Sequence, residues 1–188
     1  MTLHIKNMVC PRCIRVVREE LLQLGLEVGT VSLGEAEVKA PKGQMLDVHL
    51  IGNTLQENGF ELVKDRNTQL VEDVKRTIID IVHHAKQFNL SVKNSDYIAE
   101  KVGLSYSSLS RLFSKQEGLT IEKYIILQKI EKVKELLEYE ELTLSQIADK
   151  LGYSSVQHLS NQFRKEVGMS VSAYKESPES LRKSISDV

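Results

Sequence analysis

Two cysteines close to the start of the sequence, Cys10 and Cys13, have a spacing that is typical of a site for a soft metal ion. They lie directly before a predicted helix, and the unpaired N–H groups and the dipole at a helix amino terminus lower the pKa of a thiol. Arg12 and Arg15 add positive charge nearby. Because the thiolate is the form that binds metal, this position favours metal binding.

The number of ligands decides which metal we expect. Two sulfur ligands without an obvious third suit copper(I) better than zinc, which usually takes four ligands. Zinc remains open, since a partner chain or His4 would complete its shell. The same spacing also suits a redox-active thiol pair, or two cysteines without a role. We interpret Met8 as a core side chain, and His83 and His84 as helix-surface or packing residues, because adjacent helical positions do not face each other.

A second set of polar side chains lies on a stretch whose pattern predicts a helix-turn-helix. Thr143 can cap a first helix, Gly152 can supply the turn, and a second helix restarts near Ser155. Apolar side chains recur at helical spacing in the two helices, at Leu144, Ile147, Ala148 and Leu151, and then at Val156, Leu159, Phe163 and Val167. This spacing leaves the polar side chains of the second helix off the core.

The same pattern occurs earlier in the chain, which indicates a duplicated unit. At an offset of 49 residues (147 minus 98), Ile98, Ala99, Lys101 and Gly103 match Ile147, Ala148, Lys150 and Gly152. At an offset of 50 residues (159 minus 109), Leu109, Ser110, Phe113, Lys115, Gly118 and Tyr124 match Leu159, Ser160, Phe163, Lys165, Gly168 and Tyr174. One residue is therefore inserted in the second turn or recognition helix.

Over about residues 70–177, this duplicated pattern resembles the DNA-binding domain of AraC/XylS-family transcription regulators. In that family a long helix joins two helix-turn-helix units, and here it would run from Ile121 to Glu138. The stretch KIEKVKELL, which begins at Lys129, resembles the linker motif of the family with Lys for Arg and Val133 for Ala. The tail GMSVSAYK resembles its closing motif, with Val171 where Pro is common. The resemblance implies an all-α domain that binds double-stranded DNA.

The resemblance also implies which side chains contact DNA. The first recognition helix would run over about residues 105–117, and the candidates on both helices are Tyr106, Ser107, Ser110, Arg111, Lys115, Gln157, His158, Ser160, Asn161, Arg164 and Lys165. Arg111 can pair with both guanine acceptors in the major groove, whereas Asn161 at the matching position suits adenine, so the two half-sites should differ. Lys115, Arg164 and Lys165 are expected at phosphates. Two units on one linker helix should address successive major grooves, about 34 Å apart. A solvated helix face is the alternative for each residue.

The first third of the chain predicts a small mixed domain. Residues 2–7 alternate as a half-buried strand does, and apolar positions from Arg12 recur at helical spacing until Gly25. Residues 26–33 and 36–38 predict a hairpin around Gly34 and Glu35. A second helix over about residues 46–58 and a last strand over 60–63 complete the order βαββαβ.

This order, with the stretch from Asn7 to Cys13 closing the first strand and opening the first helix, resembles the heavy-metal-associated domain of copper chaperones and metal-transporting ATPases. The resemblance covers about residues 1–65, with Asn7 where that family carries Gly and Gly59-Phe60 where it often has Gly-Tyr. It implies an α+β chain. A ferredoxin-like domain at residues 1–66 would precede an all-α AraC-type domain at residues 67–178, and residues 179–188 would be frayed.

Composition limits the remaining choices. A hydrophobic content of 41% and a charged content of 27% are those of an ordinary soluble protein. The net charge of −1 gives the DNA hypothesis no support, because a nucleic-acid-binding domain is typically basic. The first ten residues contain no signal-peptide core and no stretch is long enough to cross a bilayer, so we expect a cytoplasmic protein without membrane contact. No phosphate-binding glycine loop, zinc-protease motif or nucleophile elbow occurs, which indicates a non-enzyme.

The hypothesis that unites these patterns is a DNA-binding transcription regulator that senses a soft metal ion, copper most of all, through Cys10 and Cys13. One alternative is a regulator whose first domain only forms a homodimer or acts as a thiol redox sensor. Another is a metal carrier or thiol oxidoreductase, which would leave the duplicated unit without a purpose. The target genes, and whether the regulator activates or represses, are not encoded in these patterns.

Overall fold

A computed structural model describes residues 1–63, 65–84, 94–176 and 182–185 of the 188 residues. The chain divides into two compact units, Met1–Arg76 and Thr77–Val188, and each is described by itself. The helix α3 (Arg66–Ile79) contains the division, whereas the sequence predicts a domain boundary at residues 66 and 67.

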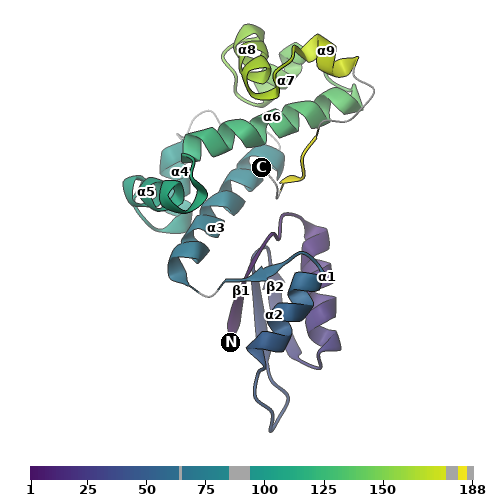
Figure 1. Cartoon of the computed structure of the whole chain (residues 1–188), viewed down its shortest axis with the longest axis vertical. Coiled ribbons are helices and arrows are strands. Elements are labelled where there is room, and N and C mark those ends of the chain that lie inside the picture. The colour runs from purple at the N-terminus through teal and green to yellow at the C-terminus, as the bar shows by residue number, and fades with distance from the viewer. Residues whose placement is uncertain (64, 85–93, 177–181, 186–188) are drawn as a thin grey trace. The chain divides into compact units, whose positions relative to one another are not determined.

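The first unit contains a four-stranded antiparallel sheet, two helices between its strands and the first part of α3 (Figure 1). Along the chain these elements are β1 (Thr2–Lys6), α1 (Pro11–Gln23), β2 (Glu27–Ser32), β3 (Glu35–Lys39), α2 (Val48–Glu57) and β4 (Glu61–Leu62). The strands lie in the order β2-β3-β1-β4, so the first and last strands of the unit pair with each other. The element order is the predicted βαββαβ, and α2 begins two residues after the predicted start.

Alternation along β1 places one of its faces in the core. Leu3 and Ile5 are buried, and they join a cluster that includes Val17 and Leu21 of α1 and Leu55 of α2. Met8 is 1% exposed and belongs to the same cluster, which confirms the prediction that it is a core residue. The sheet and its two helices therefore hold one apolar core between them, which fixes the start of α1 and the loop that precedes it.

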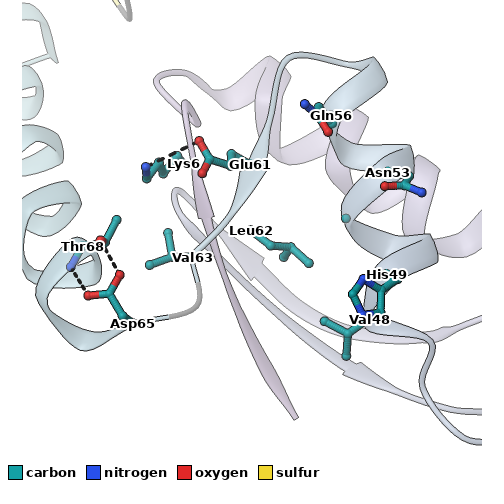
Figure 2. A pocket seen from close by; sticks show the side chains of 11 residues that line it. Lys6, Val48, His49, Asn53, Gln56, Glu61, Leu62, Val63, Asp65 and Thr68 are labelled. Carbon is teal, nitrogen blue, oxygen red and sulfur yellow. Dashed lines mark hydrogen bonds and ion pairs between the residues drawn. The ribbon is translucent and has the colours of Figure 1, made fainter.

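Helix α3 also contacts the sheet and the turn between β2 and β3. The Gln69 amide nitrogen lies 2.9 Å from Nδ1 of His4, and the Arg76 guanidinium donates to the carbonyl oxygen of Leu33. Asp65 precedes the helix and accepts from the backbone N–H of Thr68. A groove of about 400 Å³ lies between α2, β4 and this helix start, with polar side chains on its rim (Figure 2).

The second unit is helical (Figure 1). After the π-helical turn η1 (Asp80–His84), its elements are α4 (Asn94–Val102), α5 (Tyr106–Glu117), α6 (Ile121–Tyr139), α7 (Leu144–Lys150), α8 (Val156–Val167) and α9 (Val171–Lys175). The long helix α6 contacts α5 on one side of the duplication and α7 and α8 on the other. The two helix-turn-helix repeats are thus α4 with α5 and α7 with α8, joined by α6 as predicted.

The duplication extends to the caps and the aromatic contacts. Ser105 and Ser155 cap the amino termini of α5 and α8, and Gly118 and Gly168 end these helices in the left-handed conformation that glycine adopts without strain. The rings of Phe113 and Tyr124 lie 5.5 Å apart between centroids, and those of Phe163 and Tyr174 also lie 5.5 Å apart. Each repeat therefore folds around the same aromatic pair.

A short segment near the end of the chain lies along α6. Arg182 pairs with Glu138 at 3.3 Å, the backbone N–H of Lys183 donates to Glu131 at 2.9 Å, and the carbonyl oxygen of Ile185 accepts from the Gln128 amide at 3.1 Å. These residues fall in the segment that the sequence predicts to be frayed, and they make defined contacts.

Candidate nucleic-acid interface

The side of α5 that faces away from the core carries a polar stripe. Leu109 and Phe113 are 1% and 0% exposed and hold the helix to the rest of the unit. Ser107, Arg111 and Lys115 are exposed, and their spacing of four residues places them along one line of the helix surface. A helix held in this way can present that line to another molecule without changing its own packing.

The helix α8 repeats this arrangement. Leu159 and Phe163 are buried, while Gln157, Asn161 and Lys165 form an exposed stripe at the same spacing. The Gln157 amide nitrogen donates to the Asn161 side-chain oxygen at 2.9 Å, which holds the two amides together. Among the other candidates, His158 and Arg164 are exposed, and Ser110 and Ser160 are half-buried.

Four basic side chains of α5 and α8 are available to an anionic partner. Arg111, Lys115, Arg164 and Lys165 are exposed, and none of the four makes an ion pair within the part of the chain that the structure describes. Guanidinium and ammonium groups in this state can meet phosphate oxygens or base acceptors without first breaking an internal contact.

Two of the candidate residues have internal partners that the sequence did not predict. The Tyr106 hydroxyl donates to a Glu122 carboxylate oxygen at 2.6 Å, and burial together with this carboxylate raises the pKa of Tyr106. Nδ1 of His158 lies 3.0 Å from the Ser154 hydroxyl, and its ring meets the Tyr153 ring edge-on at 5.4 Å. The turn from Gly152 to α8 is one residue longer than the turn from Gly103 to α5. The inserted residue therefore lies in the turn that contains Tyr153 and Ser154, the two contacts of His158, and the change of offset in the sequence marks this place.

The thiols of Cys10 and Cys13 lie close together at the start of α1. Their sulfur atoms are 3.5 Å apart, and Cys10 is the residue directly before the helix. Burial raises the pKa of Cys10, but the hydrogen bonds from Cys13 and the nearby charge of Arg12 outweigh it and lower the pKa. Burial raises the pKa of Cys13. The Cys10 thiol therefore loses its proton more easily than the Cys13 thiol, and the thiolate is the form that binds a soft metal ion.

The backbone at Asn7 shapes this loop. Asn7 has a φ of +67°, in the left-handed region that glycine and asparagine tolerate best, and its amide nitrogen donates to the carbonyl oxygen of Gly59 at 2.9 Å. Asn7 thus adopts a conformation that a glycine could also adopt at this position. The thioether of Met8 accepts from the backbone N–H of Gly34 at 3.3 Å, so it faces the core rather than the thiols.

The histidines do not extend the thiol site. His4 lies 3.3 Å from Glu35 and contacts Gln69, while Nε2 of His83 lies 2.8 Å from the Gln128 side-chain oxygen. His83 is half-buried, as expected for a packing residue, and burial lowers its pKa. Across the described residues, no group of three or more His, Cys, Asp and Glu side chains gathers as it would around a metal ion.

Comparison with known proteins identifies the helical part. Residues 98–177 match a family model described as "Helix-turn-helix domain". The "HTH-type transcriptional activator RhaS" of Escherichia coli (strain SE11) is 35% identical over 77 residues, which are 41% of this chain and 28% of that protein. The "Probable transcriptional regulator LumQ" of Photobacterium leiognathi is 29% identical over 148 residues, which are 77% of this chain and 57% of that protein.

A solved structure from Chromobacterium violaceum, described as a "transcriptional regulator (AraC-type DNA-binding domain-containing proteins)", has 26% sequence identity and a TM-score of 0.49. It covers 61% of this chain and 100% of that chain. The family match confirms the helix-turn-helix predicted from the sequence, and this chain spans 28% and 57% of the two curated relatives. The heavy-metal-associated resemblance of residues 1–65 lies outside the residues that the family model matches, and it stays a prediction. Among the helices of residues 1–63, 65–84, 94–176 and 182–185, none has the length and hydropathy of a membrane-spanning segment.

Proposed function

We propose that this chain, whose residues 98–177 form a helix-turn-helix domain of the AraC type, is a sequence-specific DNA-binding transcription regulator. The observation that carries the proposal is the pair of matched stripes on α5 and α8. Each stripe is exposed, ends in a lysine, and lies on a helix that is capped at both ends and packed through a buried Leu and Phe. Two helices presented in this way can enter successive major grooves of one duplex.

The two stripes differ in the bases that they suit. The Arg111 guanidinium is exposed and can donate two hydrogen bonds to the O6 and N7 acceptors of guanine. Asn161 occupies the matching position of α8, and an amide suits the N6 and N7 groups of adenine. The contact with Gln157 restricts the orientation of the Asn161 amide before DNA arrives. The proposal therefore includes two half-sites of different sequence.

Selection of bound duplexes from a random pool, with the full chain, tests this proposal. We expect two unlike half-sites about one helical turn apart. Replacement of Arg111 by alanine should cost about 1–3 kcal/mol and relax the base preference in one half-site only, and Asn161→Ala should do so in the other. Arg66→Ala removes an exposed charge outside the matched domain and serves as the control. A selected site with one half-site only would contradict the proposal.

We further propose that the thiols of Cys10 and Cys13 bind a soft metal ion and that this binding changes the affinity for DNA. What supports the proposal is the short distance between the two sulfur atoms, the position of Cys10 next to the amino terminus of α1, and the chemistry of a two-thiolate set. Such a set suits copper(I), which accepts few and soft ligands, better than zinc. The metal would act as a ligand that favours one of two states, and it must bind those states unequally to have any effect.

Two measurements test the metal proposal separately from DNA binding. Titration of the reduced protein with copper(I) should show one bound ion, which is lost in Cys10→Ser and Cys13→Ser. Gel-shift assays with the selected duplex should then give different affinities with and without copper. Bound copper with no change in affinity would leave a carrier or a domain that only forms a homodimer. An affinity that changes with oxidation of the thiols instead would favour the redox sensor.

A further inference from the structure

We propose that Glu122 and Lys123, two neighbouring residues at the start of α6, are positioning residues that fix the two recognition helices relative to each other and so set the spacing between the half-sites. The inference rests on the proposed DNA-binding function. It concerns residues that lie outside both stripes. It also concerns the preferred spacing between two half-sites, a property that requires both helix-turn-helix repeats.

Glu122 holds the first recognition helix. Its carboxylate accepts a hydrogen bond at 2.6 Å from the hydroxyl of Tyr106, the first residue of α5. Hydrogen bonds with an ionised acceptor are shorter and stronger than those between neutral groups. The hydrogen bond from Tyr106 lowers the pKa of Glu122, as expected when the donor stabilises the carboxylate. The amino-terminal end of α5, which would point into the groove, is thereby tied to α6.

Lys123 holds the second recognition helix. Its ammonium lies 2.5 Å from a carboxylate oxygen of Glu166, which is near the carboxyl-terminal end of α8. The Glu166 side chain is only 8% exposed, whereas that of Lys123 is 41% exposed. A carboxylate with so little access to water depends on its partner, because an unpaired buried charge is strongly destabilising. This contact is therefore a defined tie, unlike an ion pair between two solvated side chains.

The position of the two ties explains why they act together. Glu122 and Lys123 are adjacent on one helix, where neighbouring side chains point about 100° apart, so the first turn of α6 reaches both recognition helices. Polar contacts from Lys129 and Glu138 of α6 reach Tyr153 and Tyr174, which lie outside α8. The contact of α6 with α8 itself includes the apolar cluster that contains Ile130, Val133, Leu159 and Phe163. Loss of the Lys123 contact would therefore leave the hydrophobic packing of α8 intact and let the helix change its angle to α6.

The spacing of half-sites is sensitive to such an angle. One inserted base pair moves a half-site by about 3.4 Å along the duplex and turns it by roughly 35° about the axis. Two recognition helices at a fixed angle must then lose contact with one half-site or deform the DNA, and either costs free energy of binding. A pair with a loosened angle can follow the displaced half-site. The contacts of Glu122 and Lys123 should therefore make the affinity for DNA fall when the spacing between the half-sites is changed.

The experiment uses the full chain and the duplex obtained by selection, with the selected spacing and with one base pair inserted between the half-sites. For the wild type we expect the insertion to weaken binding about tenfold or more, and for Lys123→Gln and Glu166→Gln about threefold or less. Glu122→Ala should lower the penalty in the same way through Tyr106. The exchange Lys123→Glu with Glu166→Lys restores the pair and should restore the penalty.

The ratio of the two affinities is the measured quantity, so a general change in charge cancels from it. Lys175→Gln removes a charge from an exposed ion pair with Glu140 and should keep the wild-type ratio. Specific binding by the wild type with an unchanged penalty in Lys123→Gln and Glu166→Gln would overturn the inference alone. Absence of any sequence preference in the wild type would refute the proposed function, and the inference with it. If Glu166→Gln does not fold, the double variant Lys123→Glu with Glu166→Lys still tests the inference. A double variant that folds but shows no penalty for the inserted base pair would contradict it.

Discussion

Replacement of Lys129 by methionine should stabilise the second unit at neutral pH. Lys129 lies on α6, half-buried, with its ammonium nitrogen 5.3 Å from the centroid of the Tyr153 ring. Burial lowers the pKa of Lys129 to about 8 from a usual value of 10.5. The folded unit therefore holds this proton less tightly than the unfolded chain does. Methionine keeps a flexible apolar stem of similar length without the charge.

The magnitude follows from the pKa of Lys129 in the two states. At 1.36 kcal/mol for each tenfold change in proton affinity, the difference between 10.5 and about 8 corresponds to about 3 kcal/mol of free energy of unfolding. The ammonium also gains about 1 kcal/mol from the face of the Tyr153 ring, which methionine loses. The lowered pKa indicates that burial outweighs the favourable contacts of the ammonium. We therefore expect Lys129→Met to raise the free energy of unfolding by about 2 kcal/mol at pH 7.

The same pKa predicts how this effect depends on pH. Below pH 8 the lysine is protonated in both states, and the burial cost is present in full. Between about pH 8 and pH 10 the unfolded chain holds more protons, so the wild type gains stability as pH rises. Methionine does not titrate. The advantage of the variant should therefore shrink steadily over this range.

Urea unfolding at several values between pH 7 and pH 9.5 measures the difference. Lys101→Met is the matched control, because the Lys101 ammonium lies 5.6 Å from the Tyr97 ring on an exposed side chain. That control should change stability by about 0.5 kcal/mol or less. A Lys129→Met variant that is less stable than the wild type at pH 7, or a gain that does not decline towards pH 9.5, would refute the reasoning.

Two further changes test other parts of the fold. Removal of all residues after 181 should destabilise the second unit by roughly 2–4 kcal/mol in urea unfolding, because the buried Gln128 loses an acceptor and Glu131 loses a donor; unchanged stability would show that this segment is not part of the folded unit. Asn7→Ala should destabilise the first unit by about 1 kcal/mol more than Asn7→Gly, since both lose the contact with Gly59 but only alanine is strained at a φ of +67°; equal losses would argue against that conformation.

The repeated core could be predicted because it is recorded twice in the sequence. Leu109, Phe113, Leu159 and Phe163 stand at equal spacing in the two repeats, and all four are at most 1% exposed. An apolar side chain at helical spacing is seldom stable anywhere but in the core, so its pattern is informative by itself. The same argument correctly predicts the order of elements in the first unit and the core position of Met8.

The polar side-chain contacts between helices could not be predicted in this way. The partners in Tyr106–Glu122 and Lys123–Glu166 are separated by 16 and 43 residues, and no periodicity relates them. Long charged side chains can reach many positions, and only the angle between packed helices selects one. The segment 182–185 is a similar case, because its polar composition is that of a frayed end and its partners lie more than 40 residues earlier. Packing decides such contacts, and composition does not.

The distribution of charge explains why composition gave the DNA hypothesis no support. Residues 77–188 carry 15 Lys and Arg and 15 Asp and Glu, so their net charge is zero. The acidic side chains of α6 are turned to internal partners, with Glu131 on Lys134, Glu135 on Lys132, and Glu138 on Tyr174. The basic side chains of the two stripes have no such partners among the described residues. Since a Debye length of about 8 Å screens the distant carboxylates, a phosphate at the stripes meets a locally basic surface on a neutral unit.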